Sequence, residues 1–426
     1  MSELETADRT KDASNQSKWS MVGRDPYQMS LQEIDLSHPG IWQTNEYLPF
    51  LKRLREEDPV HYCPESAVGP YWSVMKYKDI MTVDTSHDIY SSEPTIGIVD
   101  MFEEFTLPMF IAMDPPKHDE QRRIAQPVVA PANLKNLEGL IRERVCNILD
   151  NLPRDEEFDW VEKVSIELTT QMLATLFDFP FEDRYKLTYW SDVSTAIPGA
   201  GVVDTYEERW TAMQECLACF VELRNQRVNQ PPANDLVSML AHGEATRNMP
   251  PMEYLGNIML LIVGGNDTTR NSISGGVLAL NEFPAEYDKL RADHSLIPNM
   301  VSEIIRWQTP LAYMRRTAVV DTELGGKQIK AGDKVVMWYI SGNRDEDAID
   351  RADEFLIDRA KARQHLSFGF GLHRCMGNRL AEMQLRILWE EIMQRFHKVE
   401  VVGEPKRVYS SFVKGFTELP VRVHPL

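Results

Sequence analysis

A single cysteine, Cys375, lies in the stretch FGFGLHRCMG, residues 368–377. A cysteine sulfur binds a metal only as the thiolate, and a buried thiolate needs compensating donors. Amide groups of a tight turn and the N-terminus of a following helix supply such donors. Gly369, Gly371 and Gly377 let the backbone wrap around the sulfur and approach a flat, bulky group. The stretch predicts a metal-ligating thiolate; the alternative is a buried structural cysteine in a glycine-rich loop.

A second candidate site is GGNDTT, residues 264–269, in the middle of a long apolar helical pattern. A glycine inside a helix lowers helix stability by about 1 kcal/mol relative to alanine. Its presence here indicates that a ligand needs room close to the backbone. Gly264 and Thr268 are four residues apart and share a face, and Asp267 lies beside them. We expect the Thr268 hydroxyl to bond to the carbonyl four residues earlier. Taken alone, the pattern fits either a ligand-facing helix or a helix kink with incidental polar residues.

Two further patterns pair charged or polar side chains on one helical face. Glu303 and Arg306 are three residues apart, which suits an ion pair, and an exposed pair would be the ordinary interpretation. His118 and Arg122 are four residues apart on a helix opened by two prolines, and two donors on one face suit a pair of carboxylates.

The stretch around Cys375 resembles the haem-binding loop of the cytochromes P450, the haem-thiolate monooxygenases. The other patterns follow in that family's order, and the resemblance covers the chain from about residue 40 to its end. It implies haem b as cofactor, Cys375 as the iron ligand, and a helical prism of triangular outline around the buried haem. It also implies that Thr268 and Asp267 supply protons for cleavage of the O–O bond of O2.

The resemblance assigns two further sets of residues. Glu303 and Arg306 would form a buried structural pair completed by a second arginine, with Arg359 preferred over Arg344. The residues expected to contact haem are His118, Arg122, Arg316 and His373 at its propionates, and Phe368, Gly369, Gly264 and Gly377 close to the ring.

The elements that must position these residues are mainly helical. Helical periodicity dominates from about residue 117 to 310, and residues 251–284 read as one long buried helix. Strand patterns occur at residues 69–75, at residues 316–340 as two strands around Gly325-Gly326, and at residues 407–423 as a hairpin. This predicts a mainly α fold with small β-sheets at the two ends of the chain, an α+β class.

Composition and charge limit the partners and the cellular location that we expect for the chain. The net charge of −19 argues against a nucleic-acid partner, and no apolar run approaches the length of a membrane span. The polar N-terminus lacks signal-peptide features, so we expect a cytoplasmic protein with a flexible tail at residues 1–40 and a single domain at residues 41–426. Five scattered cysteines, including the pair Cys216 and Cys219 on one helix face, predict no disulfide framework.

The electrons for the reaction must come from another protein, because no flavin or nicotinamide motif and no ferredoxin cysteine spacing is present. By resemblance to soluble bacterial relatives, the partners are a ferredoxin and an NAD(P)H-dependent ferredoxin reductase. Lys361, Arg363, Arg379 and Arg386 would offer a basic docking patch; solvated helix faces are the alternative.

Segments such as GGNDTTRNSISGG and RWQTPLAYMRRTA resemble those of bacterial alkane terminal hydroxylases. The resemblance implies oxygen insertion at the terminal carbon of medium-chain alkanes, fatty acids or related apolar chains. The alternatives are a terpene or steroid-like substrate and, in a different class, a haem sensor or an H2O2-driven peroxygenase. The expected substrate contacts are Ile96, Ile98, Val99, Met101, Phe102, Ile197, Val202, Val203, Leu260, Val263, Gly264, Leu311, Met314 and Phe412.

Overall fold

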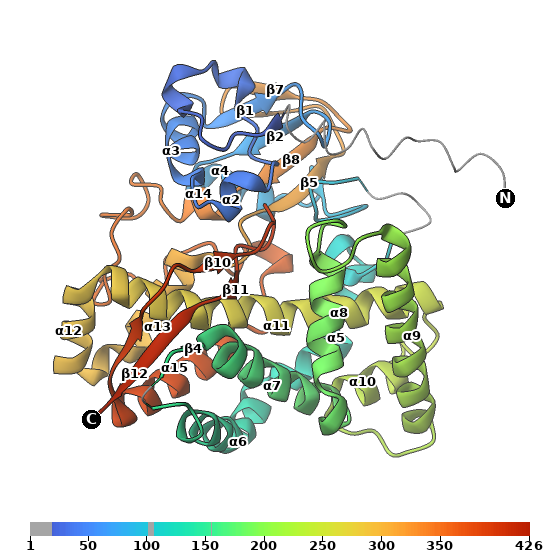
Figure 1. Ribbon diagram of the computed structural model, residues 1–426. Coiled ribbons are helices and arrows are strands. Elements are labelled where there is room, and N and C mark those ends of the chain that lie inside the picture. The colour runs from blue at the N-terminus through green and yellow to red at the C-terminus, as the bar shows by residue number, and fades with distance from the viewer. Residues whose placement is uncertain (1–18, 101–105, 155) are drawn as a thin grey trace.

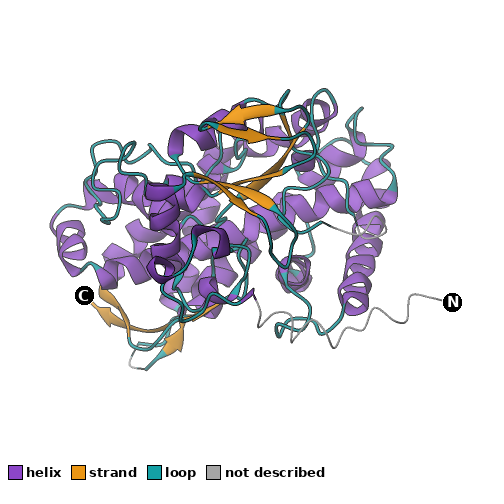
Figure 2. Ribbon diagram, turned by 90° about the horizontal axis from the view of Figure 1, so that it is seen from above, coloured by secondary structure: helices purple, strands orange, loops and turns teal. Residues whose placement is uncertain are grey.

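The computed structural model of the chain describes residues 19–100, 106–154 and 156–426. A helix-rich body surrounds the long helix α11 (Pro251–Glu282), and a five-stranded sheet lies above it in the view of Figure 1. Seen from above, the strands of this sheet overlie the helices (Figure 2). The expected mainly helical fold with small sheets is confirmed.

Helix α11 is buried along most of its length and passes through the centre of the molecule. Pro251 occupies its first turn, where the missing amide hydrogen costs nothing, and the helix ends at Glu282 just before Phe283 and Pro284. A side chain at Gly265 would lie 2.8 Å from Leu173 of the crossing helix α7 (Glu167–Phe177), whereas Gly264 has no neighbour within 4 Å. One glycine therefore allows close helix packing, and the other leaves an opening.

Several helices pack around α11. Besides α7, those that contact it are α8 (Tyr185–Thr195), α9 (Tyr206–Val228), α12 (Pro284–Ala292), α13 (Ile297–Gln308) and α15 (Asn378–Arg395). Elsewhere in the described part of the chain, the α-helices are α2 (Gly40–Gln43), α3 (Tyr47–Glu57), α4 (Tyr77–Thr85), α5 (Lys117–Ala125), α6 (Pro131–Asp150), α10 (Leu236–His242) and α14 (Tyr339–Gly342).

The largest sheet joins strands that are far apart in the chain. Its order is β1 (Val60–Cys63), β2 (Tyr71–Val74), β8 (Lys334–Met337), β5 (Met314–Ala318) and β3 (Tyr90–Ser91). Strands β2 and β8 pair in parallel, with Ser73 opposite Val336, and the other neighbours are antiparallel. The N-terminal strands therefore do not form a sheet of their own, because they pair with strands at residues 314–337, whereas the C-terminal strands form small sheets apart from them.

The remaining strands form three small sheets. The turn at Gly325-Gly326 is confirmed, with φ of +56° and +76°, and connects β6 (Thr322–Leu324) to β7 (Lys327–Ile329). The predicted C-terminal hairpin is found as β10 (Lys406–Arg407) and β11 (Phe416–Glu418). The last strand, β12 (Pro420–Pro425), pairs with β9 (Phe396–Val401) and β4 (Phe158–Asp159) instead.

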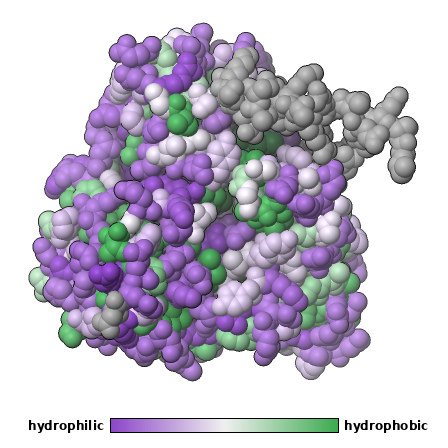
Figure 3. Space-filling view, viewed as in Figure 1, coloured by the Kyte–Doolittle hydropathy of each residue, from purple (hydrophilic) through white to green (hydrophobic). Residues whose placement is uncertain are grey.

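The described part of the expected N-terminal tail is packed. Met21, Ile34 and Leu36 are buried in one hydrophobic cluster with Trp42 and Trp338. The prediction of a flexible tail to residue 40 is therefore wrong for the part of residues 21–40 that these three side chains anchor in the core. The visible face is largely hydrophilic, with hydrophobic residues in small groups (Figure 3). Within the described residues, no helix has the length and apolarity needed to cross a bilayer.

Candidate active site

Cys375 faces an internal cavity of about 200 Å³. Its amide donates to the Phe368 carbonyl at 2.8 Å, which closes the loop before α15 begins. Burial raises the pKa of the Cys375 thiol, and the backbone amides of Gly377 and Asn378 act against that rise. The start of α15 therefore supplies amide donors to the sulfur, as a thiolate site requires.

The loop takes a conformation that requires glycine at two positions. Gly369 and Gly371 have φ of +65° and +64°, a region that residues with a side chain rarely adopt. A side chain at Gly371 would also lie 2.6 Å from the Asp84 carbonyl. The backbone is thus held tightly against helix α4.

Asp84, which the sequence analysis missed, fixes this loop from behind. Its carboxylate accepts hydrogen bonds from the Arg316 guanidinium at 2.8 Å, the Tyr339 hydroxyl at 2.9 Å and the Phe370 amide at 2.7 Å. Burial raises the pKa of Asp84, and the positive charge of Arg316 opposes the rise. No local pattern marks Asp84, because its partners lie more than 200 residues away.

Two histidines present unpartnered nitrogens beside the cavity. The rings of His118 and His373 lie 4.2 Å apart, and His118 Nε2 and His373 Nδ1 are buried without a described hydrogen-bond partner. Burial lowers the pKa of both rings, that of His373 to about 2. A neutral His373 can donate from Nδ1 while its Nε2 accepts from the Ser92 hydroxyl at 2.8 Å. Because His118 Nδ1 donates to the Asp119 carboxylate at 2.7 Å, its Nε2 carries a hydrogen only in the protonated ring. The Nδ1 donor of His373 fits a carboxylate of a haem group, and a protonated His118 would add a second donor.

The two arginines expected at the propionates line the same cavity. Arg316 is bound to Asp84, and Arg122 donates to the Arg374 carbonyl in the cysteine loop. Phe368, Gly369, Gly264 and Gly377 also line this cavity, and Gly264 leaves its wall open. The residues present therefore fit a flat, doubly anionic group with a thiolate ligand.

Glu303 forms a fully buried ion pair with Arg306, with Nη2–Oε1 and Nε–Oε2 distances of 2.7 and 2.8 Å. Arg359, the arginine preferred from the sequence, completes the cluster through its Nε at 3.0 Å from Glu303 Oε2. Although burial raises the pKa of Glu303, hydrogen bonds from the two arginines bring it below its ordinary value. Arg344 instead donates to the Trp307 carbonyl at 3.1 Å and stacks over its ring.

Thr268 and Asp267 point in different directions. Thr268 lines the Cys375 cavity and donates to the Gly264 carbonyl at 2.9 Å, as expected. Asp267 is buried on another face of α11, where it accepts hydrogen bonds from Ser191 at 3.0 Å and from Arg270 at 3.1 Å. Burial raises the pKa of Asp267 to about 6, although the Arg270 guanidinium opposes the rise.

Asp267 has one connection toward the cavities. Thr195 Oγ1 lies 3.5 Å from Asp267 Oδ2, and Thr195 lines a second cavity that continues from the first. On the outer side, Arg270 also binds Asp192, whose side chain is 33% exposed. A buried acid with a pKa near neutrality therefore lies between solvent and the cavities, which suits proton transfer.

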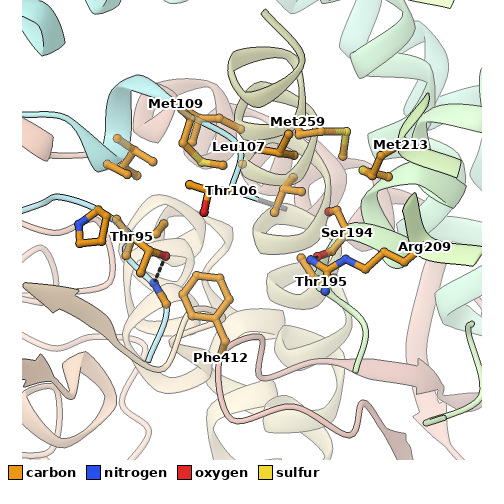
Figure 4. Close-up of a pocket in the computed structure, with 18 of the residues that line it drawn as sticks. Thr95, Thr106, Leu107, Met109, Ser194, Thr195, Arg209, Met213, Met259 and Phe412 are labelled. Carbon is orange, nitrogen blue, oxygen red and sulfur yellow. Dashed lines mark hydrogen bonds between the residues drawn. The ribbon is translucent and has the colours of Figure 1, made fainter. Parts of the chain in front are cut away.

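The second cavity, of about 280 Å³, has mainly apolar walls (Figure 4). It shares Ile111, Leu260, Gly264, Leu311 and Met314 with the cavity of Cys375. The predicted substrate residues that line it are Ile96, Leu260, Val263, Gly264, Leu311, Met314 and Phe412.

Other predicted contacts lie elsewhere. Ile98 is buried in the cluster around Trp338, Val203 lies in the main core, and Val99 and Val202 are exposed. These predictions are wrong because both segments are bent loops in which neighbouring side chains face different surroundings. Ile197 is half-buried and does not line the cavity. Met101 and Phe102 lie outside the described residues.

Several residues of the cavity wall were not predicted from the sequence. Leu107 and Met109 precede the short helical turn Phe110–Ala112, and Met259 lies one turn before Val263 on α11. Arg209 and Met213 lie four residues apart on α9, and this spacing is the one signal that could have grouped them.

Comparison with known proteins agrees with this geometry. The family model described as Cytochrome P450 matches residues 203–421. The linalool 8-monooxygenase of Pseudomonas putida is 34% identical over 93% of this chain and 100% of its own length. The methyl-branched lipid omega-hydroxylase of Mycobacterium tuberculosis is 31% identical over 94% of this chain and 96% of its own. Among solved structures, the cytochrome P450-153 from Novosphingobium aromaticivorans has a TM-score of 0.87 and 47% identity, covering 92% of this chain and 99% of its own.

Proposed function

This chain belongs to the cytochrome P450 family, and we propose that it oxidises the terminal carbon of medium-chain alkanes, fatty acids or similar apolar chains. As a member of the family it is a monooxygenase that binds haem and needs O2 and a redox partner. One oxygen atom of O2 enters the C–H bond, and the other leaves as water with two protons and two electrons.

Bound haem supplies the activation of O2, and the chain's own residues supply the positioning. Cys375 would ligate the iron, with its negative charge stabilised by the amides at the start of α15. The free nitrogens of His118 and His373, with Arg122 and Arg316, would bind the propionates. Buried apolar walls exclude water from the reacting carbon.

The observation that carries the substrate proposal is the continuity of the two cavities. Leu260, Leu311 and Met314 line both, so a mainly apolar path leads from Cys375 and Thr268 to the loop at residues 94–97. A primary C–H bond is the strongest on an alkyl chain, so terminal oxidation requires that the walls present only the methyl end. The methyl-branched lipid omega-hydroxylase among the relatives supports the same reaction type.

Product analysis tests this proposal. With a ferredoxin, its reductase and NAD(P)H, we expect decane and dodecanoic acid to give mainly the terminal alcohol. Mainly subterminal alcohols would contradict the proposal. Replacing the electron donors with H2O2 should give much less product, and comparable turnover would instead support a peroxygenase.

A terpene is the second candidate substrate, favoured by the similarity to linalool 8-monooxygenase. Titration of the haem spectrum with decane, dodecanoic acid and linalool separates the two candidates. We expect tighter binding of the linear chains, because their surface fits a long apolar path. Tighter binding of linalool would favour the terpene instead.

We propose that Thr268 and Asp267 together deliver protons to the cavity of Cys375. The Thr268→Ala variant loses the hydroxyl at this position, so NAD(P)H use should continue while product per NAD(P)H falls about tenfold, with H2O2 released instead. Thr211→Ala is a matched control, because Thr211 also bonds to the carbonyl four residues earlier but lies on the exposed face of α9. Unchanged coupling in Thr268→Ala would contradict the relay.

We also propose a ferredoxin and its reductase as the electron donors. Lys361 and Arg379 are exposed, and no described carboxylate lies within ion-pair distance of either. Arg386 is less available than expected, because it pairs with Glu138 at 2.6 Å and with Glu390 at 2.7 Å. Arg363 pairs with Glu382 but keeps an exposed side chain, so it can still contact an acidic partner.

A further inference from the structure

One cation lies in the wall of the apolar cavity. Arg209 is the only charged side chain among the described residues that line it. Its guanidinium donates to the backbone carbonyls of Ser194 and Ala196, and no described carboxylate lies within ion-pair distance. Figure 4 shows the side chain reaching from α9 toward Ser194 and Thr195. Among the described residues, the site thus contains a positive charge without a counter-ion.

Arg209 is half-buried in the cavity wall. Burial lowers the pKa of its guanidinium, yet an arginine stays protonated in proteins, so the positive charge remains. Hydrogen bonds to two carbonyls satisfy some of its donors but leave the charge uncompensated. A carboxylate would satisfy the remaining donors and also balance the charge, because a guanidinium can bind its two oxygens through parallel N–H bonds.

We propose that Arg209 binds the carboxylate of a linear fatty acid whose methyl end extends toward Cys375. This inference rests on the proposed function and narrows it to an anionic, amphipathic chain. Arg209 lines the cavity of about 280 Å³ and not the one that Cys375 lines, while Leu260 and Gly264 line both. The charge and the thiolate therefore lie in separate parts of one continuous path.

This placement makes a specific demand on chain length. A fatty acid held by its carboxylate can bring its methyl group to the reacting position only if its length matches the path. An alkane has no such anchor and can slide. We therefore expect fatty acids to show a narrow optimum of chain length for terminal oxidation and alkanes a broader one.

The test uses the haem-loaded full chain and a pair of ligands that differ only in the head group. In the Arg209→Gln variant, the dissociation constant of dodecanoic acid at pH 7.5, read from the haem spectrum, should rise about 10- to 100-fold. That of dodecane should change less than about twofold, because dodecane has no charge to lose. Arg209→Lys should restore part of the affinity, since a lysine keeps the charge without the paired geometry.

Arg224→Gln is the matched control, because Arg224 lies on the same helix and also donates to a backbone carbonyl, that of Arg247, but lines neither cavity. It should leave both dissociation constants unchanged. Equal weakening of both ligands in Arg209→Gln, or an unchanged affinity for dodecanoic acid, would overturn the inference.

The two proposals fail in different ways. If Arg209→Gln leaves the binding of dodecanoic acid intact while dodecane is still oxidised at its terminal carbon, only the role of Arg209 is wrong. If wild type oxidises both ligands at internal carbons, the proposed terminal oxidation is wrong, whatever the binding titrations give.

Discussion

The Cys375→Ala variant is expected to give no detectable monooxygenase product, because Cys375 is the one cysteine among the described residues that line the two cavities. Alanine offers no atom that can bind iron, and the amide donors at the start of α15 would face an empty position. The readout is product formation together with the haem spectrum of the reduced carbon-monoxide complex, which should lose its thiolate-specific band. The fold should persist, since the helical core does not depend on the sulfur.

Cys219→Ala is the control for this experiment. Cys219 is half-buried on α9 and packs at the edge of the main core, away from both cavities. The control should keep the haem spectrum and the activity of wild type. Product formation by Cys375→Ala, with circular dichroism showing a normal helix content, would refute the assignment of the iron ligand.

The motifs carried by neighbouring residues could be predicted from the sequence. Glu303 and Arg306 lie on one helix, so their spacing alone places them in contact, and the helix boundaries at Pro251 and Pro284 follow from the chemistry of proline. The conformation of the loop before Cys375 could also be predicted, because the glycines that determine it lie within a few residues of the sulfur.

Contacts between distant segments could not be predicted in this way. Asp84 binds Arg316 and Tyr339 across more than 200 residues, and β2 pairs with β8 across a similar separation. Such partners are chosen by tertiary packing, which no local pattern records. The wall of the apolar cavity could not be predicted for the same reason. Ile96 lines the cavity, while Ile98, two residues later, packs into the core.

The different surroundings of Thr268 and Asp267 are a second feature that the sequence pattern did not predict. Adjacent residues on a helix point about 100° apart, so both could not face the same cavity. The structure separates them: Thr268 lies at the cavity of Cys375, and Asp267 lies between α11 and α8. Asp267 is connected to the second cavity through Thr195, and the spacing of residues along the chain gave no sign of this contact.

The Glu303→Gln variant is expected to have the largest effect on stability. Arg306 and Arg359 are buried around Glu303, and a neutral amide would leave two positive charges without a counter-ion. Removing one partner of a buried ion pair typically costs about 3–5 kcal/mol, which is a large fraction of the stability of a protein. Urea unfolding followed by circular dichroism measures the loss, and haem retention should fall with it.

Glu354→Gln provides the matched comparison, because the Glu354 carboxylate forms an exposed pair with Arg351 whereas its backbone carbonyl accepts from Arg306 and Arg359. The substitution keeps those carbonyl bonds, so the cost should stay below about 1 kcal/mol. Equal losses of stability in the two variants would show that burial of the charge does not determine the cost.

In wild type, the pKa of Glu303 is lowered by folding. Its contribution to stability is therefore complete above the ordinary glutamate pKa of about 4.3 and is lost as the pH falls through the lower pKa of the folded state. Glu303→Gln should therefore lose less additional stability than wild type on acidification below pH about 4, because it has no carboxylate to protonate at this position.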